Sequence, residues 1–250
     1  MSWARACAPT ALATSLPERD GVLITRPPPG AEDTAARVAA LGLRPILAPL
    51  LDIAPLAVRL PPPADVQAIL IASGHAIPSL PLALHSVPVL AVGDATAARA
   101  RAAGFLHVRS AGADAVALAA LAADVADPHG RPLLLAAGRG QSQKLAADLR
   151  GRGFRVLRRA VYASSPARRL PDAALAALAS PLLRAVLFFS AETAHAFVRL
   201  LVRARLRDSV REVDACAIGA PAAAAIEVLP WRHVMCAARP TQDAMLALLS

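Results

Sequence analysis

The stretch 184-RAVLFFSAETAHAFVRLL-201 carries the pattern that decides the fold. Its apolar run, AVLFF, predicts a strand buried on both faces. The run leads to Ser190, where a helical pattern begins at once. The segment 68-AILIASGHAIPSL-80 has the same layout, with Ser73 in the place of Ser190. Two strand–serine–helix patterns in one chain predict βα units and a parallel sheet.

Further apolar runs support this reading. They are 21-GVLIT, 88-PVLAV, 132-PLLLA and 214-DACAI, and each precedes a helical pattern rich in Ala, Leu and Arg. Helices are predicted over residues 31–41, 94–104, 141–151 and 192–201. Gly42, Gly104 and Gly153 each stand where a helix is expected to stop. The fold class is therefore α/β with parallel sheets.

Similar segments recur in the same order along the chain, which indicates an internal duplication. Gly219 and His233 follow Gly93 and His107 by 126 positions each. Ser190 follows Ser73 by 117 positions, and the segment 133–156 repeats the segment 22–45 at a spacing of 111. Two similar α/β domains are therefore predicted. Chance similarity in an alanine-rich sequence is the alternative.

Two β-like, proline-flanked stretches separate the repeated units and are the natural interdomain connections. We place the linkers at 48–54 and 158–167. Two connections mean that the chain leaves the first domain, at 20–47, and returns to it at 168–250. The second domain is expected at 55–157, and residues 1–19 are expected to form a disordered tail.

The composition of the chain limits the classes of function that it can have. The formal charge is +9, and Lys144 is the only lysine among 27 basic residues. Arginine suits two-point binding of carboxylate or phosphate, although GC-rich codons also favour arginine over lysine.

No apolar run approaches the ~20 residues that cross a bilayer. The three cysteines, Cys7, Cys216 and Cys236, show no disulfide or zinc spacing, so a cytoplasmic setting is expected.

The ends of the predicted strands are candidate anion sites, because a helix N-terminus presents free N–H groups and partial positive charge. In α/β sheets, ligands also bind at the carboxyl ends of strands. The candidates at these ends are Ser73, Ser190, Gly93, Gly219, Gly138 and Arg26. Simple helix capping is the alternative for Ser73, Ser190, Thr96 and Thr241.

Tyr162 is the only tyrosine of the chain, and it lies in the second connection. A phenol at that position can donate a hydrogen bond or a proton to a ligand. A ring that serves only packing is an equally good reading of the sequence.

Together, several segments resemble uroporphyrinogen-III synthase from about residue 20 to residue 250. They are TRPPPGAEDTAARVAALGLRPILAPLLDI, ILIASGHA, VGDATA, GFLHV, VYASSPA, LFFSAETAHAFVRLL, AIG and AARPTQDAML. Each motif is weak alone, but their ordered set is specific. The family fold is two α/β domains joined by a two-stranded linker, with the first domain discontinuous in sequence.

The resemblance implies a reaction: cyclisation of hydroxymethylbilane, with loss of water, a spiro intermediate and inversion of the last pyrrole ring. It implies no cofactor or metal. The substrate's eight carboxylates suit the many N–H ends and the positive charge. The implied protein is a monomer that binds neither nucleic acid nor membrane, with a possible transient contact with the preceding pathway enzyme.

The resemblance also assigns site residues. Tyr162 falls on the functionally important linker tyrosine, which is expected to assist departure of the hydroxyl group. The expected substrate-binding residues are Arg26, Ser73, Gly93, Thr96, Gly138, Arg139, Ser190, Thr193, Gly219, Arg239 and Thr241. Lys144 is a weaker candidate. The sequence departs from the family pattern at Ala222, where members often carry threonine, so one hydroxyl contact is missing.

Two other functions fit the composition. A non-catalytic two-domain protein would use the same strand ends to sense a polycarboxylate or a tetrapyrrole. A nucleic-acid-binding module would cluster its basic residues on one face and lose affinity steeply with salt. The arginines are instead spread over many predicted helices, which disfavours the second.

Overall fold

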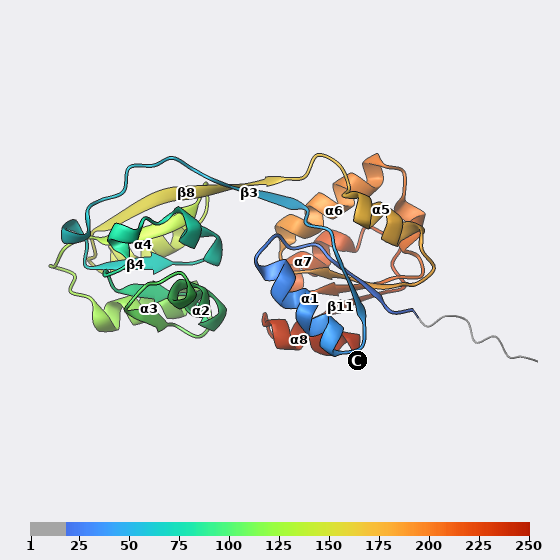
Figure 1. Ribbon diagram of the computed structural model, residues 1–250, viewed down its shortest axis with the longest axis horizontal. Coiled ribbons are helices and arrows are strands. Elements are labelled where there is room, and N and C mark those ends of the chain that lie inside the picture. The colour runs from blue at the N-terminus through green and yellow to red at the C-terminus, as the bar shows by residue number, and fades with distance from the viewer. Residues whose placement is uncertain (1–18) are drawn as a thin grey trace, which may run out of the picture. The chain divides into compact units, whose positions relative to one another are not determined.

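The computed structural model describes residues 19–250, so the expected disordered tail lies outside the described residues except for Arg19. The chain forms two compact units (Figure 1). Unit 1 contains the residues up to Leu51 together with Pro166–Ser250, and unit 2 is Asp52–Ser165. The chain therefore leaves the first unit and later returns to it, as predicted.

Unit 1 is built on a five-stranded sheet in the order β11-β10-β9-β1-β2, in which all neighbouring strands are parallel. The strands are β1 (Gly21–Ile24), β2 (Arg44–Leu47), β9 (Leu183–Phe188), β10 (Asp214–Ala217) and β11 (His233–Cys236). The helices are α1 (Gly30–Ala40), α5 (Asp172–Ala179), α6 (Ala191–Arg203), α7 (Ala220–Ile226) and α8 (Gln242–Leu246), with short 3-10 turns η4 (Arg207–Val210) and η5 (Ala247–Leu249).

Unit 2 is built on a six-stranded sheet in the order β3-β8-β7-β4-β5-β6. The strands are β3 (Leu51–Pro55), β4 (Ala68–Ile71), β5 (Val89–Ala91), β6 (Val108–Ser110), β7 (Leu133–Gly138) and β8 (Val156–Pro166). The helices are α2 (Asp94–Ala102), α3 (Ala115–Val125) and α4 (Gln143–Gly151), and the 3-10 turns are η1 (Pro63–Asp65), η2 (Gly74–Ser79) and η3 (Leu82–Leu84).

Strands β3 and β8 form the pair in which the chain passes from one unit to the other. Leu56 N donates to Val161 O at 2.9 Å, and Ala167 N donates to Leu50 O at 2.9 Å. The residue numbers of the paired partners rise along one strand as they fall along the other, so this pair is antiparallel. The residues expected as the second linker, 158–167, lie almost entirely in β8, and β8 also pairs with β7 inside unit 2.

The six predicted strands are all present, and α1, α2, α4 and α6 cover the predicted helices. Gly42, Gly104 and Gly153 have φ values of +77°, +95° and +90°, so they end their helices in the left-handed conformation, as predicted. One prediction needs correction. No α-helix follows Ser73, because Pro78 lacks the N–H of a continuing helix and the segment forms the 3-10 turn η2.

The two sheets repeat one strand order, which confirms the duplication at the level of topology. The strands that correspond by sequence spacing are β4 and β9, β5 and β10, β6 and β11, β7 and β1, and β8 and β2. Substituting these equivalents turns β11-β10-β9-β1-β2 into β6-β5-β4-β7-β8, the order of the second sheet without β3. Each sheet thus takes three strands from one repeat and two from the other.

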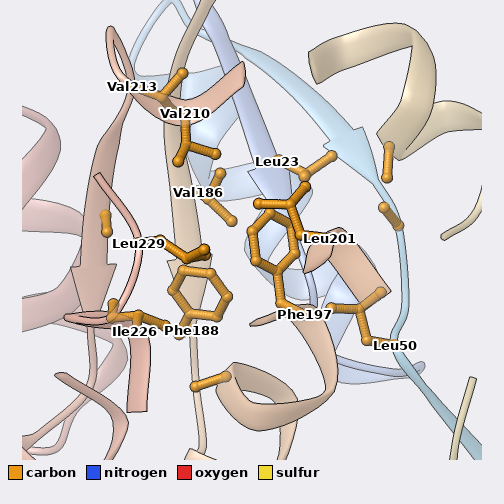
Figure 2. Close-up of a cluster of buried hydrophobic side chains, with 14 of the residues drawn as sticks. Leu23, Leu50, Val186, Phe188, Phe197, Leu201, Val210, Val213, Ile226 and Leu229 are labelled. Carbon is orange, nitrogen blue, oxygen red and sulfur yellow. The ribbon is translucent and has the colours of Figure 1, made fainter. Parts of the chain in front are cut away.

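Apolar side chains cover both faces of each sheet. Figure 2 shows the largest cluster in unit 1, where Phe188 of β9 packs against Phe197 of α6 with ring centroids 5.3 Å apart. Each such buried ring contributes roughly 1.5–3 kcal/mol. This packing holds α6 against β9, and so holds Ser190 at the end of that strand.

Candidate functional site

The expected site residues fall on two sheet edges, one in each unit, because the carboxyl ends of parallel strands meet at one edge. In unit 1, β1, β9, β10 and β11 lead into Arg26, Ser190, Gly219, Arg239 and Thr241. In unit 2, β7, β4 and β5 are adjacent and lead into Gly138, Ser73 and Gly93. The adjacent strand ends therefore bring these groups together within each unit.

Arg26 joins three elements at the edge of unit 1. Its Nη1 donates to Thr34 Oγ1 of α1 at 3.3 Å and to Gln242 Oε1 of α8 at 3.4 Å. The guanidinium also lies 4.4 Å from the centre of the Phe189 ring, immediately before Ser190. These contacts bring Arg26 to the start of α6 and to the start of α8, which Thr241 caps.

The hydroxyl groups at the strand ends act as caps. Ser190 Oγ accepts from Thr193 N at 3.1 Å, and Thr241 Oγ1 accepts from Ala244 N at 3.3 Å. Ser73 Oγ accepts from His75 N at 3.4 Å. Thr96 differs from the capping expectation, because it lies inside the first turn of α2 and is buried.

Helices α2 and α7 are among those that begin without a side-chain cap, and each of the two follows a glycine. Gly93 precedes α2 and Gly219 precedes α7, and neither end has a side-chain hydrogen bond to its first N–H groups. The absence of a side chain leaves room for a ligand to approach the backbone. Pro221 removes one N–H group from the first turn of α7. The α2 end is thus the richer set of donors.

Arg99 belongs to the edge of unit 2, and the sequence analysis missed it. It lies one turn after Thr96 on α2, and its Nη1 would be 3.0 Å from a Cβ placed on Gly74. A half-buried arginine thus lies over the turn that follows Ser73. Its spacing of three residues from Thr96, on the same helix face, was the available signal.

Tyr162 lies inside unit 2, where its side chain is only 2% exposed. The ring packs edge-on against His75, with centroids 5.8 Å apart. The hydroxyl group donates to Gln141 Oε1 at 2.7 Å, and Gln141 is a partner that the sequence analysis did not foresee. Both readings of Tyr162 therefore have support: the ring packs, and the hydroxyl group stays at the carboxyl end of β7.

The remaining candidate residues differ in their exposure to solvent. Arg139, Lys144 and Arg239 are exposed, and the Arg139 backbone N–H donates to Tyr162 O at 2.9 Å. Thr193 is buried beneath Ser190, and its hydroxyl donates to Ser190 O at 2.9 Å. Ala222 is buried in α7.

A separate polar cluster lies at the start of β10, at the end of the strand away from the candidate edge. Asp214 accepts from Arg232 Nε at 2.8 Å and lies 2.9 Å from His233 Nδ1. Burial raises the pKa of Asp214, but the hydrogen bonds from Arg232 and His233 outweigh burial, so the pKa is lowered overall. This geometry gives His233 a structural role, as a hydrogen-bond partner of Asp214.

Other chemistry is limited in the described part of the chain. Burial raises the pKa of the Cys216 thiol to about 12, which keeps it protonated and unreactive. Residues 19–250 contain no cluster of three or more His, Cys, Asp or Glu arranged to hold a metal ion. No described helix is long and apolar enough to span a membrane.

A model of the family described as uroporphyrinogen-III synthase HemD matches residues 32–247. The chain belongs to the uroporphyrinogen-III synthase family. Its activity is therefore that of a cyclising lyase acting on a tetrapyrrole. A comparison with curated proteins found no match.

The comparison with solved structures found similar chains. The crystal structure of the uroporphyrinogen-III synthetase from Helicobacter pylori is 16% identical, with a TM-score of 0.62, and the match covers 92% of this chain and 97% of that one. A mutant uroporphyrinogen III synthase from Thermus thermophilus is 21% identical, with a TM-score of 0.48, over 92% of this chain and 97% of that one. The first match shows that the two chains share the fold.

Proposed function

We propose that this member of the uroporphyrinogen-III synthase family converts hydroxymethylbilane into uroporphyrinogen III and water, with Tyr162 as the proton donor. The observation that carries the proposal is the position of the Tyr162 hydroxyl group, at the carboxyl end of β7 beside Gly138. The O–H group of a phenol can donate a hydrogen bond or a proton. Donation to the terminal hydroxyl group of the substrate assists cleavage of its C–O bond.

The strand ends supply the binding of the substrate's carboxylates. On the unit 1 edge we propose Arg26, Ser190, Thr193, Gly219, Arg239 and Thr241. On the unit 2 edge we propose Ser73, Gly93, Thr96, Gly138 and Arg139, and we add Arg99. Arginine binds carboxylates through two parallel hydrogen bonds, and the uncapped N-terminus of α2 adds backbone donors.

Binding at several points serves the selectivity of the reaction. Without an enzyme, the linear tetrapyrrole closes head to tail and keeps the order of its last ring. When its carboxylates are held, the linear tetrapyrrole is restricted to the geometry in which the substituted carbon of its last ring attacks first. Orientation of this kind lowers the barrier by removing entropy before the reaction.

The decisive experiment is a coupled assay. Hydroxymethylbilane is generated in situ, the protein is added, the product is oxidised, and the uroporphyrin isomers are separated by chromatography. A dominant type III isomer is expected. Only type I isomer, from protein that is folded by circular dichroism, would contradict the proposal and favour a ligand-sensing role.

We also propose a cytoplasmic monomer that meets the preceding enzyme of the pathway only transiently. The free thiol of Cys216 and the odd number of cysteines fit a reducing compartment. Light scattering coupled to size-exclusion chromatography measures the oligomeric state. Retention on heparin resin at moderate salt would reopen the question of a nucleic-acid partner.

A further inference from the structure

The hydrogen bond between Tyr162 and Gln141 restricts what the phenol can do. The hydroxyl group carries a single proton, which it donates to Gln141 Oε1 at 2.7 Å. In this arrangement the proton is directed at the glutamine. It is not available to a leaving hydroxyl group until the acceptor changes.

The loop that carries Gln141 is fastened over Tyr162 at several points. Gln141 N donates to Gly138 O at 3.0 Å, and Arg158 Nη1 donates to Gln141 O at 3.0 Å. Arg139, two residues before Gln141, donates its N–H to Tyr162 O. Both neighbours of Gln141 have positive φ, +74° at Gly140 and 58° at Ser142. The backbone is thereby bent so that the amide side chain lies against the phenol.

An amide side chain has nearly the same shape in its two orientations but opposite hydrogen-bonding character. With Oε1 toward Tyr162, Gln141 accepts the phenol proton. After a half-turn, Nε2 would donate to the phenol oxygen, leaving the proton free and stabilising the phenolate that remains. The Gln141 side chain is half-buried, so part of it is accessible to solvent.

We infer that Gln141 is a positioning residue that holds the Tyr162 hydroxyl group in place and determines, by the orientation of its amide, whether the phenol proton reaches the substrate. The inference rests on the proposed role of Tyr162. The proton goes to the leaving oxygen, the C–O bond breaks, and water departs. The ring carbon that closes the macrocycle later releases a proton, so the phenol is regenerated without a co-reactant.

Three variants test the inference. Gln141→Ala removes both the acceptor and the donor. Gln141→Glu keeps the length and an accepting oxygen, but as a carboxylate it cannot donate. Gln143→Ala, an exposed glutamine two residues away at the start of α4, is the matched control. For each protein, kcat and KM for the type III product are measured, and folding is checked by thermal unfolding.

We expect both Gln141 variants to lower kcat by roughly tenfold or more, part of the effect of a general acid, with KM changed less than threefold. Gln143→Ala is expected to match the wild type. A side chain that only filled space would tolerate Gln141→Glu. Wild-type kcat in that variant, with folding intact, would overturn the inference.

A spectroscopic readout separates this inference from the proposed function. Because Tyr162 is the only tyrosine, labelling with ¹³Cζ-tyrosine gives a single signal that reports hydrogen bonding of the phenol. The signal is expected to move in both Gln141 variants and to stay in Gln143→Ala. An unmoved signal would contradict the positioning role. A wild-type protein that yields only type I isomer would refute the proposed function, while the signal would still test the hydrogen bond.

Discussion

Gly138 and Tyr162 are cross-strand neighbours on β7 and β8, and the tyrosine ring occupies the space that a side chain at position 138 would need. A Cβ on Gly138 would lie 2.8 Å from Tyr162 Cζ and 2.6 Å from Gln141 Oε1. Gly138 is therefore required here for its lack of a side chain. This close approach is what keeps the phenol, the amide and the end of β7 together.

Gly138→Ala is expected to push Tyr162 and Gln141 apart. Overpacking of this kind costs about 1–3 kcal/mol of unfolding free energy, and synthesis of the type III isomer should fall with it. Gly151→Ala is the matched control, because no atom lies within 4 Å of its Cβ position. Denaturant unfolding and the isomer assay check both variants. Equal stability of the two would show that the site relaxes without strain.

Tyr162→Phe is expected to lower turnover strongly while the fold stays intact, because the variant keeps the ring that packs in unit 2. Loss of a positioned proton donor typically costs 10²–10⁴-fold in rate. The measurement is kcat for the type III isomer, together with the unfolding midpoint. Unchanged turnover would remove Tyr162 from the mechanism.

Ser190→Ala is expected to have two separable effects. Loss of the cap on α6 costs about 1 kcal/mol of unfolding free energy, and loss of the hydroxyl group should raise KM modestly because the backbone N–H groups remain. Ser209→Ala is a suitable control, since Ser209 Oγ donates to Leu206 O at 2.7 Å near η4, away from the strand ends. If KM stays at the wild-type value, Ser190 serves only as a cap.

Arg26→Gln and Arg99→Gln test the carboxylate sites of the two units separately. Each is expected to raise KM roughly tenfold or more, because a hydrogen bond to a charged group contributes about 1.5–3 kcal/mol. Arg211→Gln removes the same charge from an exposed pair with Asp208 and should leave KM unchanged. A similar rise in all three variants would point to general charge attraction instead of local binding.

Asp214→Asn should destabilise unit 1 in a pH-dependent way. The pKa of Asp214 is lowered on folding, so its ionised form contributes stability above the unfolded pKa of about 3.8, and this contribution is lost as pH falls through the lower folded pKa. We expect a loss of roughly 1–3 kcal/mol at pH 7. The difference from the wild type should vanish in strong acid. Unfolding curves at pH 7 and pH 3 check the sign.

Local patterns were sufficient to predict the six most buried strands and the residues at their ends. The apolar run before Ser190 and the glycine stops at Gly42 and Gly104 depend on burial and backbone conformation within a few residues, which the sequence displays directly. The pattern after Ser73 favours a helix, but Pro78 interrupts it and the segment forms a turn.

Partnerships between distant segments could not be predicted in the same way. The hydrogen bond from Tyr162 to Gln141 and the position of Arg99 over Gly74 depend on loop conformation and on which strands become neighbours. The spacing of Arg99 from Thr96 places the arginine on a helix face, but no sequence pattern identifies Gly74 or Gln141 as the partner. Side chains that act through such contacts can be identified only when the tertiary structure shows which strands are neighbours.

By itself, the sequence determined the α/β class, the duplication, and the serine and glycine residues at the strand ends, because buried strands and helix termini have local requirements. Only the tertiary structure decided the order of the strands within each sheet, and that Tyr162 meets Gln141. Strand order follows from which buried faces pack best across the whole chain. That is a competition among distant segments, and no single stretch of residues encodes its outcome.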